Sequence, residues 1–382
     1  MYILIVASGY PTEKYKLNGI FEFDQAVALS KMGHKVIYAC VDLRSIRRKR
    51  KWGFEQLEKN GVKIEAINIP CGRIPPKILN RAGVKAFKKL YNRIVRLYGV
   101  PDIVHAHFIF QGYLIARHFH EATMPLVLTE HLSTMNQRVI EPYYYRLGQF
   151  TYPRMDKVLA VSSHLGCNIT QKFDVQTDVM ANIVTTDIFS YDPMKKDENL
   201  FYFVSVGNLI PDKNMKFLVK KFIHCFHGNE NIKLYIFGDG PEKNEIEKVI
   251  IEHGMQGRIY LRGVVERSEI AQTFRACDCF VLLSKHETFG VVYIEALASG
   301  LPVVATRCGG PEDFVDESNG ILVDADNETE IEAALREMYG RAKNFDKKNI
   351  SQKTIAKFSP KTIAEGLINT YEAVIGAKKH KS

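Results

Sequence analysis

The chain has 382 residues, of which 46% are hydrophobic and 25% are charged, and its formal net charge is +9. This composition is typical of a globular protein and excludes a fibrous or disordered chain. Because a single hydrophobic core usually stops growing below this length, the sequence predicts two domains.

Cysteine usage and hydropathy indicate a protein of a reducing compartment that does not cross a membrane. The seven cysteines are an odd number, scattered through a chain large enough to fold without disulfides. The apolar run Ile3–Ala7 lacks the basic start and cleavage site of a signal peptide, so we interpret it as a buried strand. No uncharged apolar stretch approaches the roughly 20 residues of a membrane-spanning helix. We therefore expect a soluble, cytoplasmic protein.

The N-terminal half alternates short apolar runs with amphipathic stretches, which is the pattern of a parallel sheet with connecting helices. The expected strands are Tyr2–Ala7, Lys35–Val41, Val62–Ile69, Asp102–Ala106, Pro125–Thr129 and Lys157–Val161. A turn-rich loop, Pro11–Gly19, precedes an expected helix over Ile20–Met32.

A polar, proline-containing stretch at 191–199 separates the two halves, so we predict an N-terminal domain of residues 1–195 and a C-terminal domain of residues 196–357. The expected strands of the second domain are Phe201–Val206, Ile232–Phe237, Arg258–Leu261, Cys279–Leu283, Pro302–Ala305 and Gly320–Val323. Both domains are predicted to be α/β, Rossmann-like and doubly wound, facing each other across a cleft that would hold the ligands. We expect a last helix, residues 358–377, to pack back onto the first domain.

Positive charge is concentrated in the N-terminal half. Residues 1–194 hold 26 Lys+Arg and 16 Asp+Glu, against 26 and 27 in the remainder. Between Arg44 and Arg96 there are 16 basic residues and three acidic ones. A charge run usually marks a solvated face, but the extent of this one favours contact with an anionic partner.

The most informative segment lies in the second domain. Glu287 follows an apolar strand, and Gly290 opens a helix whose first amides are unpaired and whose dipole favours an anion such as a diphosphate. Glu295, just over one turn into that helix, can accept hydrogen bonds from ribose hydroxyls, and Glu287 can do the same for a sugar. Taken singly, each glutamate would be interpreted as a solvated surface residue. The surrounding Thr288-Phe-Gly and the turn Gly300-Leu-Pro favour a binding site instead.

The segment Glu287–Ala305, ETFGVVYIEALASGLPVVA, resembles the signature of the family 4, group 1 retaining glycosyltransferases, which have the GT-B fold. The resemblance continues through VGNLIPDKN, IFGDGP, LRGV and GGPE, and more weakly through much of the N-terminal half. It implies that a nucleotide-diphosphate sugar, a UDP or GDP sugar, binds the C-terminal domain. The acceptor, a glycan or a polyprenyl-diphosphate-linked sugar, is then expected to bind the N-terminal domain.

The resemblance also implies the roles of individual residues. Glu287 would contact the donor sugar, Phe289–Val291 would present backbone amides, Glu295 would hold the ribose, and Lys213 would bind the diphosphate. The nucleotide base would meet backbone groups of Gly263 and Val264. The donor-binding residues implied are Gly19, Asn208, Lys213, Gly263, Val264, Glu287, Thr288, Phe289, Gly290, Val291 and Glu295.

Several residues on the donor side can also be interpreted in a way that involves no donor binding or weakens it. Lys213 can neutralise a leaving phosphate without a metal, although a lysine there is also common at the start of a helix. Where the family usually has an arginine beside it, this chain has Asn208, which supplies hydrogen bonds but no charge. We interpret Gly238-Asp-Gly-Pro as a tight turn with a structural role at least as much as a ligand contact.

His131 follows the expected strand Pro125–Thr129 and matches the family's cleft histidine, which implies a catalytic role beside Glu287 and Lys213. An imidazole there can donate a hydrogen bond to a sugar hydroxyl, although a capping or surface histidine is the alternative. His105 and His107 lie at another strand end, but no further residue has the spacing of a zinc ligand. We therefore expect no metal and no cofactor.

The basic run is expected to attract an anionic membrane surface or a lipid diphosphate, which would make the protein peripheral on the cytoplasmic face. Its residues are Arg44, Arg47, Arg48, Lys49, Arg50 and Lys51, with Trp52 after them.

The predicted function is retaining transfer of a hexose-type sugar in bacterial surface polysaccharide biosynthesis. Since no carboxylate can be assigned as a covalent nucleophile, we expect front-face attack. Alternatives on the same fold are a nucleotide-sugar epimerase, a phosphorylase or a non-catalytic nucleotide-sugar-binding relative. A nucleic-acid-binding module would rest on basicity alone, because aromatic-basic recognition motifs are missing, and no nucleic-acid partner is expected.

Overall fold

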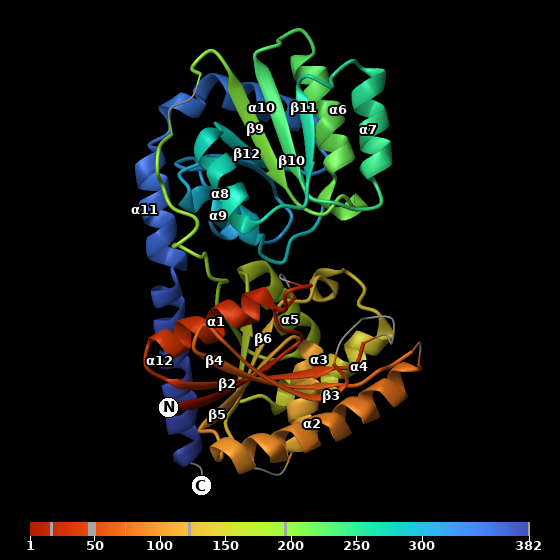
Figure 1. Ribbon diagram of the computed structural model, residues 1–382, viewed down its shortest axis with the longest axis vertical. Coiled ribbons are helices and arrows are strands. Elements are labelled where there is room, and N and C mark those ends of the chain that lie inside the picture. Colours follow the sequence, from red (N-terminus) through yellow and green to blue (C-terminus); the bar gives the residue numbers. More distant parts are fainter. Residues whose placement is uncertain (16–17, 45–50, 73, 121–123, 195–196, 381–382) are drawn as a thin grey trace. The chain divides into compact units, whose positions relative to one another are not determined.

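The computed structural model describes residues 1–15, 18–44, 51–72, 74–120, 124–194 and 197–380, which form two compact units (Figure 1). Unit 1 comprises Met1–Ile183 and Pro360–Ser382, and unit 2 comprises Val184–Ser359. Each unit is an α/β structure built on its own largely parallel sheet, so the predicted fold class is confirmed.

The sequence placed the boundary between the two domains within the polar stretch 191–199. In the structure unit 1 ends earlier, at Ile183, and unit 2 begins at Val184. The backbone amide of Val184 donates to the carbonyl oxygen of Phe358 at 2.9 Å. The Arg275 guanidinium donates to the carbonyl oxygen of Ser190 at 3.3 Å. These bonds hold the segment that precedes the polar stretch against unit 2, which moves the boundary toward the N-terminus.

Unit 1 contains an eight-stranded sheet in the order β3-β4-β2-β1-β5-β6-β7-β8, parallel except for the edge pair β3 and β4. Its strands are β1 (Tyr2–Ala7), β2 (Lys35–Asp42), β3 (Gly53–Lys59), β4 (Val62–Asn68), β5 (Ile103–His107), β6 (Leu126–Glu130), β7 (Lys157–Ala160) and β8 (Thr177–Val179). Its helices are α1 (Ile20–Lys31), α2 (Pro76–Tyr98), α3 (Ile109–His118), α4 (Pro142–Thr151), α5 (Ser163–Phe173) and α12 (Pro360–Lys379). All six predicted strands are present, and β3 and β8 are additional.

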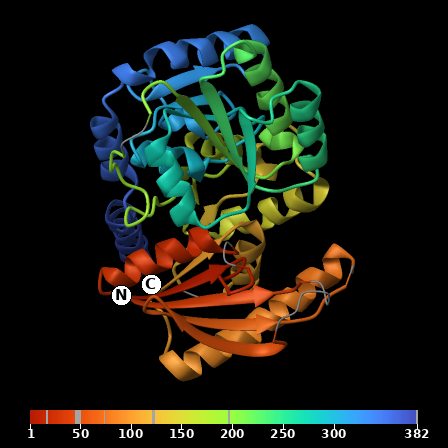
Figure 2. The same ribbon diagram turned by 45° about the horizontal axis from the view of Figure 1, so that its top comes forward.

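The edge hairpin formed by β3 and β4 lies beside β2 (Figure 2). Asn60 and Gly61 connect the two strands with φ angles of 48° and 76°, as a two-residue hairpin turn with two left-handed residues requires. The Asn-Gly pair is a strong hairpin signal in the sequence. The prediction missed β3 because this strand is almost entirely exposed and shows no apolar face.

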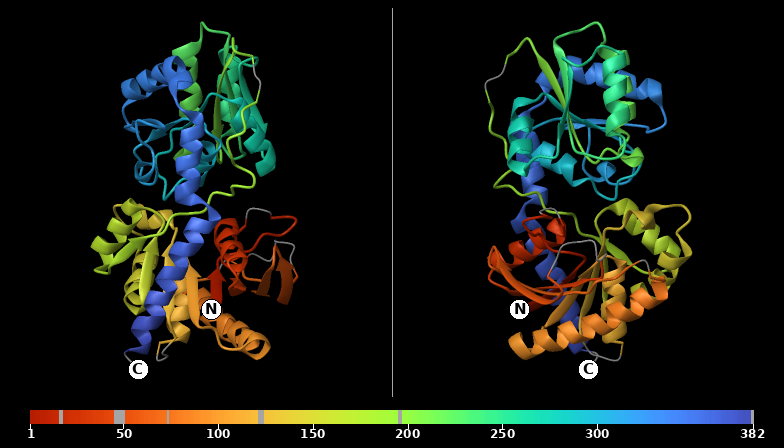
Figure 3. Two further views of the ribbon diagram at one scale, coloured as in Figure 1. Left: turned by 90° about the vertical axis from the view of Figure 1, so that its left-hand side faces the viewer. Right: turned by 45° about the vertical axis from the view of Figure 1, so that its right-hand side comes forward.

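One face of the unit 1 sheet is covered by α1 and α12, which pack against each other (Figures 1 and 3). Alternate residues of β1, such as Ile3 and Ile5, share a core cluster with Leu367 and Tyr371 of α12. Strand residues two apart point to the same face, so every second position of β1 reaches this helix layer. The C-terminal helix is therefore part of the hydrophobic core of unit 1.

Unit 2 contains a six-stranded parallel sheet in the order β11-β10-β9-β12-β13-β14. Its strands are β9 (Phe201–Val206), β10 (Ile232–Phe237), β11 (Ile259–Gly263), β12 (Cys279–Leu282), β13 (Val303–Thr306) and β14 (Gly320–Val323). Its helices are α6 (Met215–Phe226), α7 (Lys243–Glu252), α8 (Arg267–Ala276), α9 (Val291–Ala298), α10 (Glu328–Arg341) and α11 (Lys347–Phe358). The chain runs outward from β9 to β11, then restarts beside β9 with β12. The carboxyl ends of β9 and β12 therefore form the topological switch point at which open α/β sheets bind ligands.

The predicted tight turn after β10 brings two loops of unit 2 together. Gly238 has a φ of 135°, and a Cβ atom there would lie 1.9 Å from the carbonyl oxygen of Gly207. Only glycine fits this position, because any side chain would collide with backbone. The turn therefore has the structural role that the sequence indicated.

Across the described ranges, every helix is either too short or too polar to span a bilayer.

Candidate active site

The centre of the candidate site in unit 2 is an ion pair between Lys213 and Glu287. Lys213 lies in a 3-10 turn (Pro211–Lys213) after β9, and Glu287 lies in the loop after β12. The Lys213 Nζ atom is 2.5 Å from Glu287 Oε1, and the two side chains are 24% and 7% exposed. The switch point thus joins two side chains that are 74 residues apart in the sequence.

Further hydrogen bonds fix the position of Glu287. The Ser284 hydroxyl donates to Glu287 Oε1 at 2.9 Å. The Glu287 backbone amide donates to the carbonyl oxygen of Cys308 at 3.1 Å, and Glu287 forms a bridge with Gly309. The loop after β13 is held in turn by Glu312, whose carboxylate accepts from the Gly309 amide at 3.0 and 3.1 Å. The carboxylate is therefore preorganised at the carboxyl ends of three strands.

The N-terminus of α9 lies next to this carboxylate in the chain. Gly290 caps the helix with a φ of 87° and, as a glycine, makes no side-chain capping bond. A Cβ atom at Gly290 would lie 2.6 Å from the ring of Tyr293, so the position requires glycine. The Phe289 side chain is buried against Phe314 and Phe358, which leaves only its backbone for a ligand. The first amides of α9 lie where the sequence placed a helix N-terminus, and anion binding there stays a prediction.

Glu295 of α9 is paired with a residue that the sequence analysis did not identify. The Arg267 guanidinium, at the start of α8, lies 2.6 Å from Glu295 Oε1, and the side chains are 19% and 11% exposed. The same guanidinium lies 5.4 Å from the centre of the Phe189 ring. Arg267 therefore fixes the orientation of Glu295 and brings a second cation to the site, on a helix 28 residues away in the sequence.

The other donor-side predictions fall on loops of the same unit. Asn208 is exposed in the loop after β9, and Thr288 is partly exposed beside Glu287. Gly263 ends β11 with a φ of 69°, and its carbonyl oxygen accepts from the Gly238 amide at 2.8 Å. Val264 is 71% exposed. Every predicted donor residue of unit 2 therefore lies at or after the carboxyl end of a strand.

In unit 1, His131 directly follows β6 and is 9% exposed. Glu130 holds the backbone there, because its Oε1 atom accepts from the amides of His131 and Leu132, each at 2.9 Å. The Tyr152 hydroxyl donates to the other oxygen of Glu130 at 2.9 Å. The imidazole of His131 in turn lies 3.0 Å from His107, through Nε2 and Nδ1.

Burial controls the protonation of this region. Loss of solvent lowers the pKa of His131 to about 3 and that of His105 to about 3, and it lowers the pKa of His107 well below its ordinary value. Burial raises the pKa of Glu130 from 4.5 to about 7, against the opposing effect of its hydrogen bonds. All three histidines are therefore neutral at pH 7.

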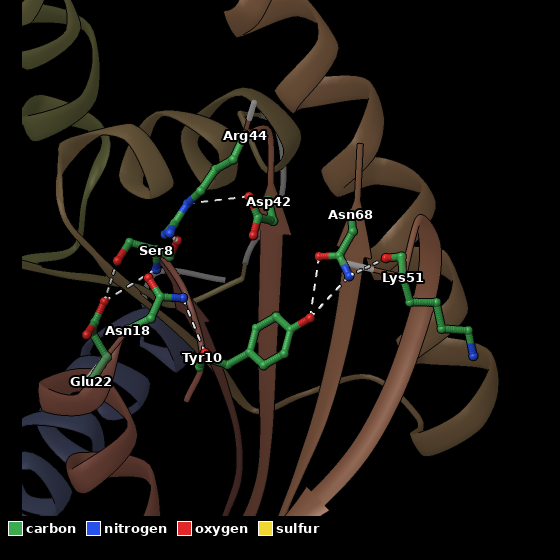
Figure 4. Close-up of polar contacts among 8 residues, drawn as sticks. All are labelled: Ser8, Tyr10, Asn18, Glu22, Asp42, Arg44, Lys51 and Asn68. Atoms are coloured by element: carbon green, nitrogen blue, oxygen red, sulfur yellow. Dashed lines mark hydrogen bonds and ion pairs between the residues drawn. The ribbon is translucent and has the colours of Figure 1, made fainter. Parts of the chain in front are cut away.

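Gly19 and Arg44 have structural roles in unit 1, and Figure 4 shows the contacts of Arg44. Gly19 has a φ of 69°, and a Cβ atom there would lie 2.3 Å from the Gly9 carbonyl oxygen. The Arg44 guanidinium pairs with Asp42 at 3.4 Å and donates to the Ser8 carbonyl oxygen at 3.0 Å. These contacts hold the guanidinium at the end of β1 with the side chain still 27% exposed, and the assignment of Arg44 to a membrane-facing surface stays a prediction.

The same end of the sheet contains a buried carboxylate. Glu22 of α1 is 2% exposed and accepts from the Ser8 hydroxyl at 2.7 Å (Figure 4). Burial raises the pKa of Glu22. Tyr10, on the loop after β1, has its carbonyl oxygen bonded to the Asn18 amide at 3.2 Å, and its hydroxyl accepts from Asn68 at 3.1 Å. These bonds shape the loop that contains Gly19.

The rest of the predicted basic run is described in part. Arg47, Arg48, Lys49 and Arg50 lie outside the described residues. Lys51 and Trp52 are both exposed, and the Lys51 side chain extends away from Asn68, which bonds its backbone oxygen at 2.9 Å (Figure 4). Helix α2 adds an exposed basic face, formed by Lys77, Arg81, Lys85, Lys88, Lys89 and Arg96.

No group of three or more His, Cys, Asp or Glu side chains that could hold a metal ion occurs among the described residues. His105 bonds to Tyr371 at 2.7 Å and to Thr129 at 2.8 Å, and His107 bonds to His131. His105 and His107, the two histidines noted in the sequence, therefore make hydrogen bonds to different partners.

Comparison with known proteins covers both units. Residues 190–352 match the family model described as glycosyl transferases group 1, and residues 23–187 match the model described as glycosyltransferase family 4. The two matches together span most of the chain, and each lies almost wholly within one unit.

The individual relatives described next share less than a third of their residues with this chain. The chain is 27% identical to the uncharacterized glycosyltransferase MJ1178 of Methanocaldococcus jannaschii, over 65% of this chain and 68% of that protein. It is also 27% identical to the phosphatidylinositol N-acetylglucosaminyltransferase GPI3 subunit of Saccharomyces cerevisiae, over 56% of this chain but only half of that protein. The structure of Anabaena Alr3699/HepE in complex with UDP superposes with a TM-score of 0.75 at 19% identity, covering 98% of this chain and all of that one. This last likeness shows the fold, and HepE in that structure binds UDP.

The Lys213–Glu287 pair predicts a measurable energetic coupling in the ligand-free protein. Lys213→Met should lower the free energy of unfolding of unit 2 by about 1–3 kcal/mol, because it leaves a buried carboxylate without its cation. Adding Glu287→Gln should recover part of that loss, as measured by urea denaturation of the single and double variants. The exposed pair Lys216 and Glu245, 2.6 Å apart, is the matched control and should show a far smaller coupling. Equal coupling in both cycles would contradict the preorganised pair.

Glu130 predicts a pH dependence of stability. Because its pKa rises from 4.5 to about 7 on folding, the folded state binds the proton more tightly than the unfolded state. The stability that this provides is present below pH 4.5 and is lost as the pH rises through 7, by roughly 3 kcal/mol in total. Glu130→Gln should remove this component when chemical denaturation is repeated between pH 4 and 8. Glu141→Gln, at an exposed position, is the control, and an unchanged pH profile for Glu130→Gln would refute the assignment.

Proposed function

Because the chain belongs to the group 1, family 4 glycosyltransferases, which are enzymes of the GT-B fold, we propose that it transfers a hexose-type sugar from a UDP or GDP sugar with retention of anomeric configuration. The observation that supports this most directly is the Lys213–Glu287 pair at the switch point of unit 2. A cation that can meet a diphosphate and a carboxylate that can meet sugar hydroxyls are held there side by side.

Each part of the donor has a matching group in unit 2. Lys213 and the first amides of α9 meet the diphosphate, and Glu287 accepts hydrogen bonds from the transferred sugar. Glu295, oriented by Arg267, accepts from the ribose hydroxyls, and the backbone at Gly263 meets the base. The binding of UDP by HepE supports a nucleotide at this site.

The transfer step follows from the same groups. The bond between the anomeric carbon and the phosphate oxygen breaks, and a bond from an acceptor hydroxyl oxygen forms on the same face of the sugar. The acceptor proton passes to the leaving phosphate oxygen, while Lys213 and the α9 dipole stabilise the charge that remains. Glu287 Oε1 accepts from both Lys213 and Ser284, which orients the carboxylate as a hydrogen-bond acceptor, and no covalent intermediate is part of the proposed step. No metal is needed for this step.

The acceptor is a glycan or a polyprenyl-diphosphate-linked sugar, taken up by unit 1 at an anionic membrane surface on the cytoplasmic side. The exposed basic face of α2 supports this assignment, because clustered Lys and Arg side chains attract anionic headgroups and diphosphates alike. The setting that fits this chemistry is bacterial surface polysaccharide assembly.

Donor binding and transfer can be tested with one panel of nucleotide sugars. The correct donor should raise the melting temperature, because selective binding adds to the stability of the folded state. Glu287→Gln should then lower kcat roughly 10- to 100-fold, since the variant loses a hydrogen bond to a charged acceptor. Glu252→Gln, at an exposed position of α7, is the control. Proton NMR of the product should show a retained anomeric configuration, without dependence on added metal.

Several outcomes of that experiment would contradict the proposal. An epimerase or a phosphorylase would yield no glycoside of a separate acceptor from the nucleotide sugar, and a binding protein would yield no product at all. A glycosyl adduct trapped on a side chain would exclude front-face attack.

Membrane association is tested by sedimentation with liposomes. The protein should co-sediment with vesicles containing anionic lipid, and salt should weaken this binding. Replacing Lys77, Lys85 and Lys88 with glutamate should reduce it roughly tenfold or more. The matched control replaces the exposed Lys220, Lys248 and Lys353 of unit 2, which changes the net charge equally. Indifference to anionic lipid, or an equal loss in both variants, would exclude this surface.

A further inference from the structure

A buried hydrogen bond links His131 to a histidine that no step above uses. His107 is the last residue of β5, and its Nδ1 atom lies 3.0 Å from Nε2 of His131. Both side chains are buried, at 0% and 9% exposure. The two rings are tilted by 31° with their centres 5.2 Å apart, so the contact is directional and not a stacking contact.

The second contact on His131 comes from the residue after His107. Phe108 places its ring 4.9 Å from the His131 ring, centre to centre. Its backbone has a φ of 68°, which is rare for a bulky residue and costs conformational energy. The Phe108 amide donates to the carbonyl oxygen of Thr129 at 2.9 Å, which fastens this strained turn to β6. Consecutive residues of β5 and its loop thus hold one imidazole from two directions.

We propose that His107 is a positioning residue for His131, donating a hydrogen bond from Nδ1 to Nε2 so that His131 carries its own hydrogen on Nδ1. The proposal rests on the proposed glycosyl transfer and on the catalytic role that the family resemblance implies for His131, and it adds the residue that sets the tautomer and orientation of that imidazole.

The direction of the hydrogen bond follows from counting hydrogens. Both rings are neutral, since burial lowers both pKa values far below 7, so a bond between them contains one hydrogen. If His131 donated, the hydrogen of His107 would lie on Nε2. That atom is buried and has no hydrogen-bond partner among the described residues. An orphaned buried N–H group is rarer in proteins than an under-satisfied acceptor, which favours donation by His107.

The consequence for the site is a fixed donor. None of the described residues bonds Nδ1 of His131, so this atom keeps its hydrogen for a ligand. An N–H group at that atom can donate to a sugar hydroxyl or to an oxygen of the leaving group, and it cannot act as a base. In water a histidine exchanges between both tautomers, and the bond from His107 removes that freedom.

The test combines NMR with kinetics on the full chain. In protein labelled with nitrogen-15 on histidine, long-range proton–nitrogen spectra at pH 7.5 should show His131 protonated on Nδ1 without any substrate. His107→Leu should shift His131 toward the Nε2 tautomer and lower kcat roughly 10- to 100-fold, with a smaller change in KM. His107→Asn, whose amide can donate from nearly the same place as Nδ1, should restore the Nδ1 tautomer and most of kcat.

Controls separate positioning from general stability. His107→Leu should fold, because it also removes an Nε2 atom that has no partner. Tyr371→Phe removes the 2.7 Å bond to His105, one ring further away, and should lower the melting temperature without changing the His131 tautomer or kcat. If His107→Leu does not fold, the positioning role is still tested by two measurements: the His131 tautomer in the NMR spectrum of the unaltered protein, and the tautomer and kcat of the His107→Asn variant.

The outcomes distinguish this inference from the proposed function. A wild-type His131 protonated on Nε2, or a His107→Leu variant with unchanged tautomer and kcat, would overturn the positioning role. Unchanged transfer in His131→Ala would instead overturn the catalytic role of His131, whatever the NMR spectra show.

Discussion

The candidate site depends on one electrostatic contact, the ion pair that joins Lys213 to Glu287 at the carboxyl ends of β9 and β12. Burying a carboxylate is costly unless a cation and hydrogen bonds compensate it, and here Lys213 and Ser284 do so at the same oxygen. The parallel sheet makes the contact possible, because strand order reverses between these two strands and their following loops diverge. The donor chemistry proposed for unit 2 follows from this arrangement.

In unit 1 the side chain for which the sequence predicts a catalytic role, His131, is neutral. Burial keeps His131, His107 and His105 uncharged at pH 7, so their roles are set by hydrogen-bond direction and not by charge. The Glu130 carboxylate accepts a hydrogen bond from the backbone amide of His131. Phe108 has an unfavourable positive φ, and its ring lies against the imidazole of His131. The His131 side chain is therefore held by buried polar contacts and by a neighbouring residue with a strained backbone.

The fold could be predicted in most of its elements, because buried parallel strands are continuous apolar runs. The prediction missed β3, because this edge strand is exposed and has no apolar face. The pair Asn60-Gly61, which is typical of a hairpin turn, was the signal that could have revealed it. The boundary between the units was displaced because single hydrogen bonds, such as that of Val184 to Phe358, assign a segment to one unit or the other. Periodicity does not reveal such bonds. The sequence predicted Glu287, Glu295 and Lys213 as site residues, and their roles stay predictions, but it did not predict that Lys213 pairs with Glu287 or Arg267 with Glu295.

By itself the sequence determined the α/β class, the family resemblance and the loops that contain the predicted site residues, since these depend on local patterns of hydrophobicity, glycine and charge. Only the tertiary structure decided which side chains meet. The pairing of Arg267 with Glu295, the contact of Arg44 with the carbonyl oxygen of Ser8 and the bond from His107 to His131 all join residues on different elements. Such contacts depend on strand order and helix packing, which bring distant positions together, and no spacing along the chain encodes them.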